Sequence, residues 1–158
     1  MLTLNEIKEV VFNFRELLEK GAKKDNYLIP EDFPIGSCTV SSTLLSYHFL
    51  KSWPNLELKG VRAATGKNHQ ISHYWLEIDD IVIDITGDQY NKMDDKCLNK
   101  NIIQNRPFPP IHISCKKESY LYNLFKVTGE ESLTHDFSMF GNDYIEDISI
   151  AYRQLLNY

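Results

Sequence analysis

One cysteine stands where a turn passes into a helix. The segment Phe-Pro-Ile-Gly-Ser-Cys ends at Cys38, and a helical spacing of apolar residues runs from Cys38 to about Ser52. A thiol in the first turn of a helix lies near unpaired amides and the positive end of the helix dipole, which favour the thiolate. The residue types and their spacing therefore predict that Cys38 is a nucleophile.

A histidine and an aspartate follow in a segment whose pattern predicts a β-hairpin. Residues 71–86, ISHYWLEIDDIVIDIT, fit two strands, 71–78 and 81–86, joined by the two residues 79–80. In that register His73 pairs with Thr86, and Asp84 is the diagonal neighbour of His73. Diagonal neighbours lie about 7–8 Å apart at the backbone, so their side chains can meet.

Two-residue alternation assigns the hairpin side chains to two faces. One face carries Tyr74, Leu76, Ile78, Ile81, Ile83 and Ile85. The other carries His73, Trp75, Glu77, Val82, Asp84 and Thr86. The alternation therefore predicts that His73 and Asp84 share one face of the sheet.

These residue types, in the chain order Cys, His, Asp, suit nucleophilic catalysis. A nucleophilic thiolate needs a base or imidazolium partner, and that partner needs an orienting acceptor. His73 can be the general base and Asp84 the orienting acid. The backbone of Gly36 and Ser37 would let a carbonyl group approach, and the Cys38 amide could serve an oxyanion.

The motifs GSC at the start of a helix, SHYWLEI and IVIDITGDQY resemble the transglutaminase-like branch of the papain-like cysteine enzymes. The resemblance covers about residues 33–90. It implies acyl transfer at amides, by hydrolysis, deamidation or crosslinking, with Cys38, His73 and Asp84 as the triad. The chain departs from the family pattern at Thr39, where the family usually has a tryptophan, and it has no glutamine just upstream of the cysteine. The expected substrate-binding residues are Gly36, Ser37, Trp75 and Gln89.

The remaining patterns predict the elements that would position this triad. Capping-box spacing at 3–6 starts a first helix that ends near Gly21, and a loop covers 22–36. Further elements are expected as a strand at about 57–64, an edge strand at 111–114 and a last helix from Asn142 or Asp143, whereas 87–105 carry no clear pattern. We expect an α+β fold of papain-like or transglutaminase-like type, in which the nucleophile helix packs on a small antiparallel sheet.

Composition limits the class of protein. The 158 residues are 42% hydrophobic, which suits a single domain over 1–158. The formal net charge of -5 gives no reason to expect a nucleic-acid or membrane partner. Three cysteines, an odd number, fit reduced thiols and a cytoplasmic protein. His112 and Cys115 have ligand-like spacing but no second pair, so we expect no metal and no cofactor.

Two classes of function remain after this reasoning. The first is a cysteine-dependent acyl-transfer enzyme that acts on a protein, peptide or small amide through a thioester. The alternative is a non-catalytic binding or immunity-type protein on the same scaffold. A metal-dependent hydrolase is a third possibility, which would require bound zinc. The sequence leaves the oligomeric state open.

Overall fold

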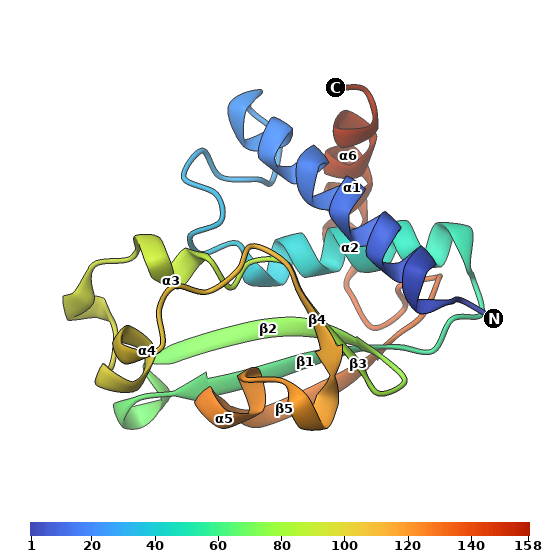
Figure 1. Ribbon diagram of the computed structural model, residues 1–158. Coiled ribbons are helices and arrows are strands. Elements are labelled where there is room, and N and C mark those ends of the chain that lie inside the picture. The colour runs from blue at the N-terminus through green and yellow to red at the C-terminus, as the bar shows by residue number, and fades with distance from the viewer.

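The computed structural model describes residues 1–158 and has an α+β fold. Five antiparallel strands form one sheet in the order β4-β3-β2-β1-β5 (Figure 1). The strands are β1 Leu58–Thr65, β2 Ile71–Ile78, β3 Ile81–Asp84, β4 His112–Cys115 and β5 Lys126–Leu133. The antiparallel sheet agrees with the prediction.

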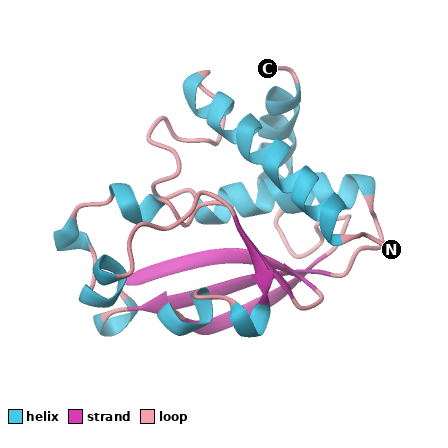
Figure 2. Ribbon diagram, viewed as in Figure 1, coloured by secondary structure: helices cyan, strands magenta, loops and turns pink.

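Three long helices lie together on one side of the sheet (Figure 2). They are α1 Leu4–Lys23, α2 Cys38–Ser52 and α6 Asn142–Leu156. Three short helices lie apart from them in the same view: α3 Gln89–Lys92, α4 Lys100–Gln104 and α5 Leu121–Leu124. None of these helices combines the length and the apolar character that a membrane-spanning segment requires.

The first helix begins as its capping signal predicts. The Glu6 amide donates to Thr3 Oγ1 (3.2 Å), and the Thr3 amide donates to Glu6 Oε2 (2.7 Å). This reciprocal pair satisfies amides that a helix start leaves without partners. One face of α1 is buried against the rest of the molecule. Its buried residues are Ile7, Val11, Phe14, Arg15, Leu18 and Gly21.

Alternate side chains of β2 enter two hydrophobic clusters, one on each face of the sheet. Tyr74 and Leu76 join a cluster of 22 buried residues that includes side chains of α1, α2 and α6. Trp75 joins a second cluster of 12, which includes Tyr90 of α3 and Ile102 of α4. The strand alternation read from the sequence is therefore confirmed, and both faces of the sheet are covered.

The hairpin register is confirmed near the turn and differs beyond it. Ile78 pairs with Ile81 across the two-residue loop, but the β2–β3 ladder ends where Leu76 pairs with Ile83. The predicted pairing of His73 with Thr86 is therefore wrong. The reason is local: the Thr86 amide donates to Asp84 Oδ1 (3.1 Å), which turns the chain out of the strand.

Two other regions differ from the sequence expectation. The edge strand β4 forms, with Asp84 of β3 opposite His112, but β5 at the other edge was not predicted. Residues 87–105, which carried no clear pattern, contain α3 and α4. The last helix begins at Asn142 with Gly141 as its N-cap, so neither Asn142 nor Asp143 is the cap.

Candidate active site

Cys38 is the first residue of α2, and the turn before it leaves that helix end open. Gly36 adopts a φ of 67°, a conformation that favours glycine. Ser37 is the N-cap residue, but its hydroxyl donates to the Pro34 carbonyl (2.8 Å) instead of capping the helix. First-turn amides have no acceptor within the helix, so the amide of Cys38 remains available to an incoming anionic oxygen.

His73 and Asp84 form a buried pair. His73 Nε2 and Asp84 Oδ2 are 2.9 Å apart, and the two residues are 2% and 1% exposed. Because a carboxylate only accepts, the shared proton belongs to Nε2 of the ring. The predicted contact between these side chains is therefore present, and it leaves Nδ1 as the ring nitrogen for a second partner.

Aromatic rings hold the His73 ring in place. Phe125 stacks on it with 5.3 Å between ring centroids, and Tyr90 meets it edge-on at 5.3 Å. Trp75 lies 6.0 Å away on the same face of β2. These contacts exclude water from the ring, which strengthens its electrostatic coupling to Asp84.

The thiol and the imidazole shift the pKa of each other. Burial raises the pKa of Cys38, but hydrogen bonding to His73 and its positive charge lower it by more, so it lies below its ordinary value. Burial likewise lowers the pKa of His73, whereas Asp84 and Cys38 together raise it to about 10. Cys38 Sγ also lies 4.0 Å from Thr39 Oγ1, and this contact lowers the pKa of the thiol further.

Asp84 is held as a carboxylate despite its burial. Burial raises the pKa of Asp84, but His73 and the Thr86 amide lower it by more, so it lies below its ordinary value. His112 stands opposite Asp84 in the ladder, and its Nε2 is 2.8 Å from Ser119 Oγ. Burial lowers the pKa of His112, which therefore stays neutral near pH 7.

Gln89 joins the cysteine turn to the histidine. Its Oε1 accepts from the Gly36 amide (3.2 Å), and its Nε2 lies 3.4 Å from His73 Nδ1. The residue is 4% exposed. Gln89 was expected to bind substrate, but it exposes little surface to one in this structure.

Arg15 is a buried cation that sequence reasoning missed. Its guanidinium forms two bonds with the Asp88 carboxylate (2.9 and 2.7 Å) and also donates to the carbonyls of Ile85 (2.6 Å) and Pro110 (3.1 Å). The Phe33 ring lies 4.7 Å from its central carbon. One side chain of α1 thus ties together the segments that carry Asp84, Gln89 and the turn before Cys38. An arginine in the apolar stripe of an amphipathic helix is the sequence signal that could have revealed it.

The sequence-predicted residues divide into two groups. Gly36, Cys38, His73, Asp84 and Gln89 come together through the contacts above. Two further expected substrate-binding residues do not reach the surface: Ser37 and Trp75 are both fully buried.

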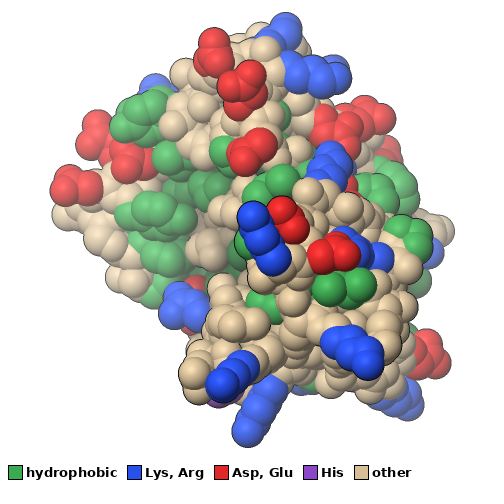
Figure 3. All heavy atoms as spheres, turned by 90° about the vertical axis from the view of Figure 1, so that its left-hand side faces the viewer, with side chains coloured by type: hydrophobic (Ala, Val, Ile, Leu, Met, Phe, Trp, Pro, Cys, Tyr) green, Lys and Arg blue, Asp and Glu red, His purple; other side chains and the backbone are tan.

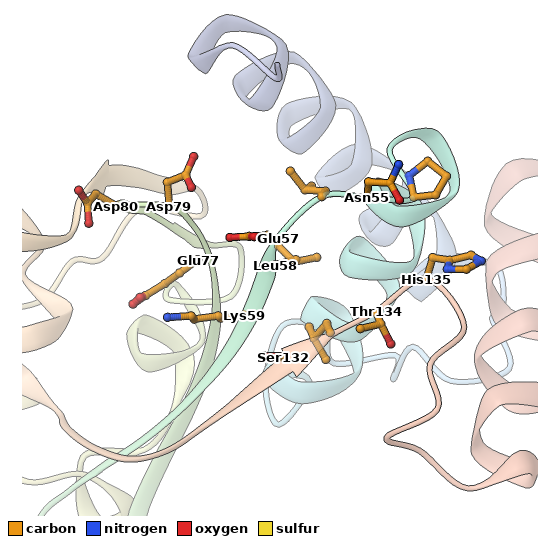
Figure 4. A pocket seen from close by; sticks show the side chains of 13 residues that line it. Asn55, Glu57, Leu58, Lys59, Glu77, Asp79, Asp80, Ser132, Thr134 and His135 are labelled. Atoms are coloured by element: carbon orange, nitrogen blue, oxygen red, sulfur yellow. The ribbon is translucent and has the colours of Figure 1, made fainter.

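A polar groove of about 760 Å³ lies elsewhere on the molecule (Figure 4). It lies where the hairpin loop, the start of β1 and the end of β5 meet, and Glu57, Lys59, Asp79 and His135 are among its lining side chains. Neither Cys38, His73 nor Asp84 lines it. No cysteine lines this groove, so it lacks the combination of thiol, imidazole and carboxylate found around Cys38.

The start of α2 points to the side of the molecule that Figure 3 shows. There, hydrophobic side chains gather in a recessed area between an upper part with mostly acidic side chains and a lower part with mostly basic ones. Thr39 and Gly36 are exposed, and Cys38 is half-buried. Cys38 is therefore partly accessible, whereas His73 and Asp84 are covered.

The arrangement brings a thiol, an imidazole and a carboxylate together in one connected site. No three His, Cys, Asp or Glu side chains are grouped so that they could hold a metal ion. In comparisons with known proteins, no family model, curated protein or solved structure matches the chain. The function must therefore be argued from the site itself.

Proposed function

We propose that this chain is a cysteine-dependent acyl-transfer enzyme of the transglutaminase-like, papain-like type, which acts on an amide bond through a thioester. The observation that carries the proposal is the buried His73–Asp84 pair beside a helix-start thiol whose pKa is lowered. Perturbed pKa values in a connected Cys-His-Asp arrangement are typical of thiol nucleophiles. We propose a protein, peptide or small amide as substrate, no cofactor, and action in the cytoplasm.

The first half of the reaction forms the thioester. The Cys38 thiolate attacks the carbonyl carbon, and the oxygen takes up the electron pair beside the open Cys38 amide. The proton on His73 Nδ1 passes to the leaving nitrogen as the carbon–nitrogen bond breaks. Amine is released, and the acyl group stays on the sulfur.

The second half returns the enzyme to its starting state. His73 Nδ1 takes a proton from water or from an acceptor amine, which attacks the thioester carbon. The carbon–sulfur bond breaks, and the thiolate re-forms beside the imidazolium. Water as acceptor gives hydrolysis or deamidation, and an amine gives a new amide. Asp84 holds the ring and stabilises its protonated form throughout.

Turnover of amide and ester probes by two variants tests the proposal. We expect Cys38→Ala to abolish acyl transfer, because it removes the atom that forms the thioester. Asp84→Asn should leave a small residual rate. The equivalent change in a serine triad costs about 10⁴ in rate, and we expect a smaller loss here because a thiol is already partly ionised. Circular dichroism should show that both variants are folded. Full activity in folded Cys38→Ala would refute the proposal that the chain is a cysteine-dependent enzyme.

A non-catalytic binding or immunity-type protein is the second candidate. It is favoured by the burial of His73 and Asp84 and by the absence of the triad from the polar groove. Iodoacetamide labelling separates the two candidates. Rapid labelling of native Cys38 near neutral pH that slows on denaturation supports the enzyme, and slow labelling of the native chain supports the binding protein.

A further inference from the structure

Gln89 is held in a single orientation between the cysteine turn and the imidazole. Its Oε1 accepts from the Gly36 amide (3.2 Å), and its Nε2 donates to the Thr86 carbonyl (3.1 Å). A backbone amide only donates and a carbonyl only accepts, so these partners fix which end of the side chain carries the oxygen. Turning the amide over would lose both bonds.

The second hydrogen on Gln89 Nε2 is therefore available to His73 Nδ1, 3.4 Å away. Because His73 Nε2 keeps its proton for Asp84, Nδ1 of the neutral ring has a lone pair that can accept from Gln89. In the protonated ring Nδ1 carries a hydrogen, and two donors then face each other. The contact fits the neutral ring and opposes the protonated one.

We propose that Gln89 is a positioning residue that holds the turn before Cys38 against His73 and favours the neutral over the protonated His73 ring. This inference rests on the proposed function, because it concerns the same thiol and imidazole. Asp84 stabilises the protonated ring, so Gln89 opposes Asp84 and limits how far the thiolate–imidazolium pair is populated. Gln89 then adjusts how far Cys38 is ionised by acting through His73, and it does so without contacting the substrate.

The other polar side chains around the His73 ring do not favour its neutral form. The titratable side chains that face His73 are Asp84 from β3, Cys38 from α2 and Tyr90 from α3. The Tyr90 hydroxyl donates to the Ser72 carbonyl (3.0 Å), and burial raises the pKa of Tyr90, so it remains neutral. Asp84 and Cys38 both favour the protonated ring. Gln89 is the polar contact that acts in the other direction.

The experiment measures the titration of His73 by NMR in a Cys38→Ala background, in which no thiolate contributes. Gln89→Met keeps the length of the side chain and removes its amide. We expect the His73 midpoint to rise by about half a pH unit to one pH unit, the equivalent of one ordinary hydrogen bond. Gln104→Met is the matched control, since Gln104 is exposed and forms no side-chain hydrogen bond. It should leave the midpoint unchanged.

An unchanged or lowered midpoint in Gln89→Met would overturn the proposal. A purely structural role predicts a lowered midpoint, because a loosened site would weaken the hold of Asp84 on the ring. A second measurement needs no Gln89 variant: in Cys38→Ala alone, the side-chain amide signals of Gln89 should shift with the His73 midpoint. If these Gln89 signals do not change as His73 titrates, the proposal is also overturned.

These outcomes are independent of the test of the proposed function. The NMR titration uses a chain without its nucleophile, so it reads the contact of Gln89 with His73 and not turnover. If the probes show no acyl transfer but the midpoint rises, the enzyme is refuted and the role of Gln89 stands. If acyl transfer is found but the midpoint does not rise, the proposed enzyme stands and the role of Gln89 is refuted.

Discussion

At the scale of single residues, the titration of Cys38 depends on a neighbour that is almost wholly buried. His73 lowers the pKa of the thiol, and this outweighs the effect of burial, which raises it. Once the imidazole is removed, only the Thr39 contact and the helix end still oppose the effect of burial on the pKa of Cys38. The pH at which the thiol reacts is therefore a direct measure of the His73 contact.

We expect alkylation of wild-type Cys38 to stay fast well below pH 8.5, about the pKa of a free cysteine. His73→Ala should move the midpoint of the alkylation rate upwards, to about pH 8.5 or higher, because the charge that favours the thiolate is lost. The measurement is the iodoacetamide rate between pH 5 and pH 10. His135→Ala, at an exposed histidine, is the control. An identical profile in His73→Ala would show that the imidazole does not activate the thiol.

Gly87 is a second residue on which the pair depends. A Cβ atom added there would lie 2.9 Å from Asp84 Oδ2 and 3.1 Å from the Tyr120 hydroxyl. The first distance is shorter than real Cβ contacts, so Gly87→Ala should displace the carboxylate that His73 holds. Weakening a hydrogen bond between charged groups should lower the Cys38 alkylation rate at pH 7 by at least roughly tenfold.

Gly129→Ala is the matched control for Gly87→Ala, because nothing lies within 4 Å of a Cβ atom built at Gly129. We expect this variant to react at the wild-type rate. Equal rates in the two alanine variants would mean that Asp84 tolerates the crowding.

At the scale of elements, the site depends on how one helix is tied to several loops. Arg15 of α1 bonds to Asp88 just before α3 and to the Ile85 carbonyl just after β3. Both partners of the ion pair are buried, with side chains 6% and 13% exposed. Removing one partner therefore leaves the other charge buried without compensation.

We expect Arg15→Met to lower the free energy of unfolding by about 3–5 kcal/mol. Asp88→Asn in the same chain should recover part of that loss, because it removes the charge left behind. Urea unfolding of the wild type, both single variants and the double variant gives the coupling energy. Strictly additive losses would show that Arg15 and Asp88 do not act as a pair.

The elements nearest Cys38 were the most predictable from the sequence. The Cys38–Ser52 helix and the hairpin turn at 79–80 follow from local spacing, and the contact of His73 with Asp84 follows from strand alternation. β5 was not predictable in this way, because its sequence KVTGEESL has charges and a glycine in place of an apolar face. The bonds of Arg15 to Ile85, Asp88 and Pro110 join residues 70 or more positions apart, and no local pattern specifies them.

At the scale of the whole molecule, β2 belongs to both hydrophobic clusters. Leu76 lies in the first and Trp75 in the second, and both are fully buried. One strand thus joins the long helices on one face to the short helices on the other. The two clusters should unfold together, since neither keeps its sheet without the other.

We expect Leu76→Ala and Ile102→Ala, one in each cluster, to lower the midpoint of a single unfolding transition. Each should reduce the free energy of unfolding by about 2–5 kcal/mol, the range for a large buried aliphatic residue. Far-ultraviolet circular dichroism and tryptophan fluorescence in urea should give coincident curves. Two separate transitions would contradict one cooperative unit over 1–158.

The two edge strands of the sheet affect how copies of the chain associate. β4 has four residues, too short to guide a long pairing, and β5 alternates exposed polar side chains such as Lys126, Thr128 and Glu130. The pairing of β5 with β1 also shifts register between Arg62 and Ala63. Short, charged and irregular edges are the means by which native sheets avoid adding a foreign strand. Both outer strands of the sheet therefore carry features that oppose edge-to-edge pairing between copies of the chain.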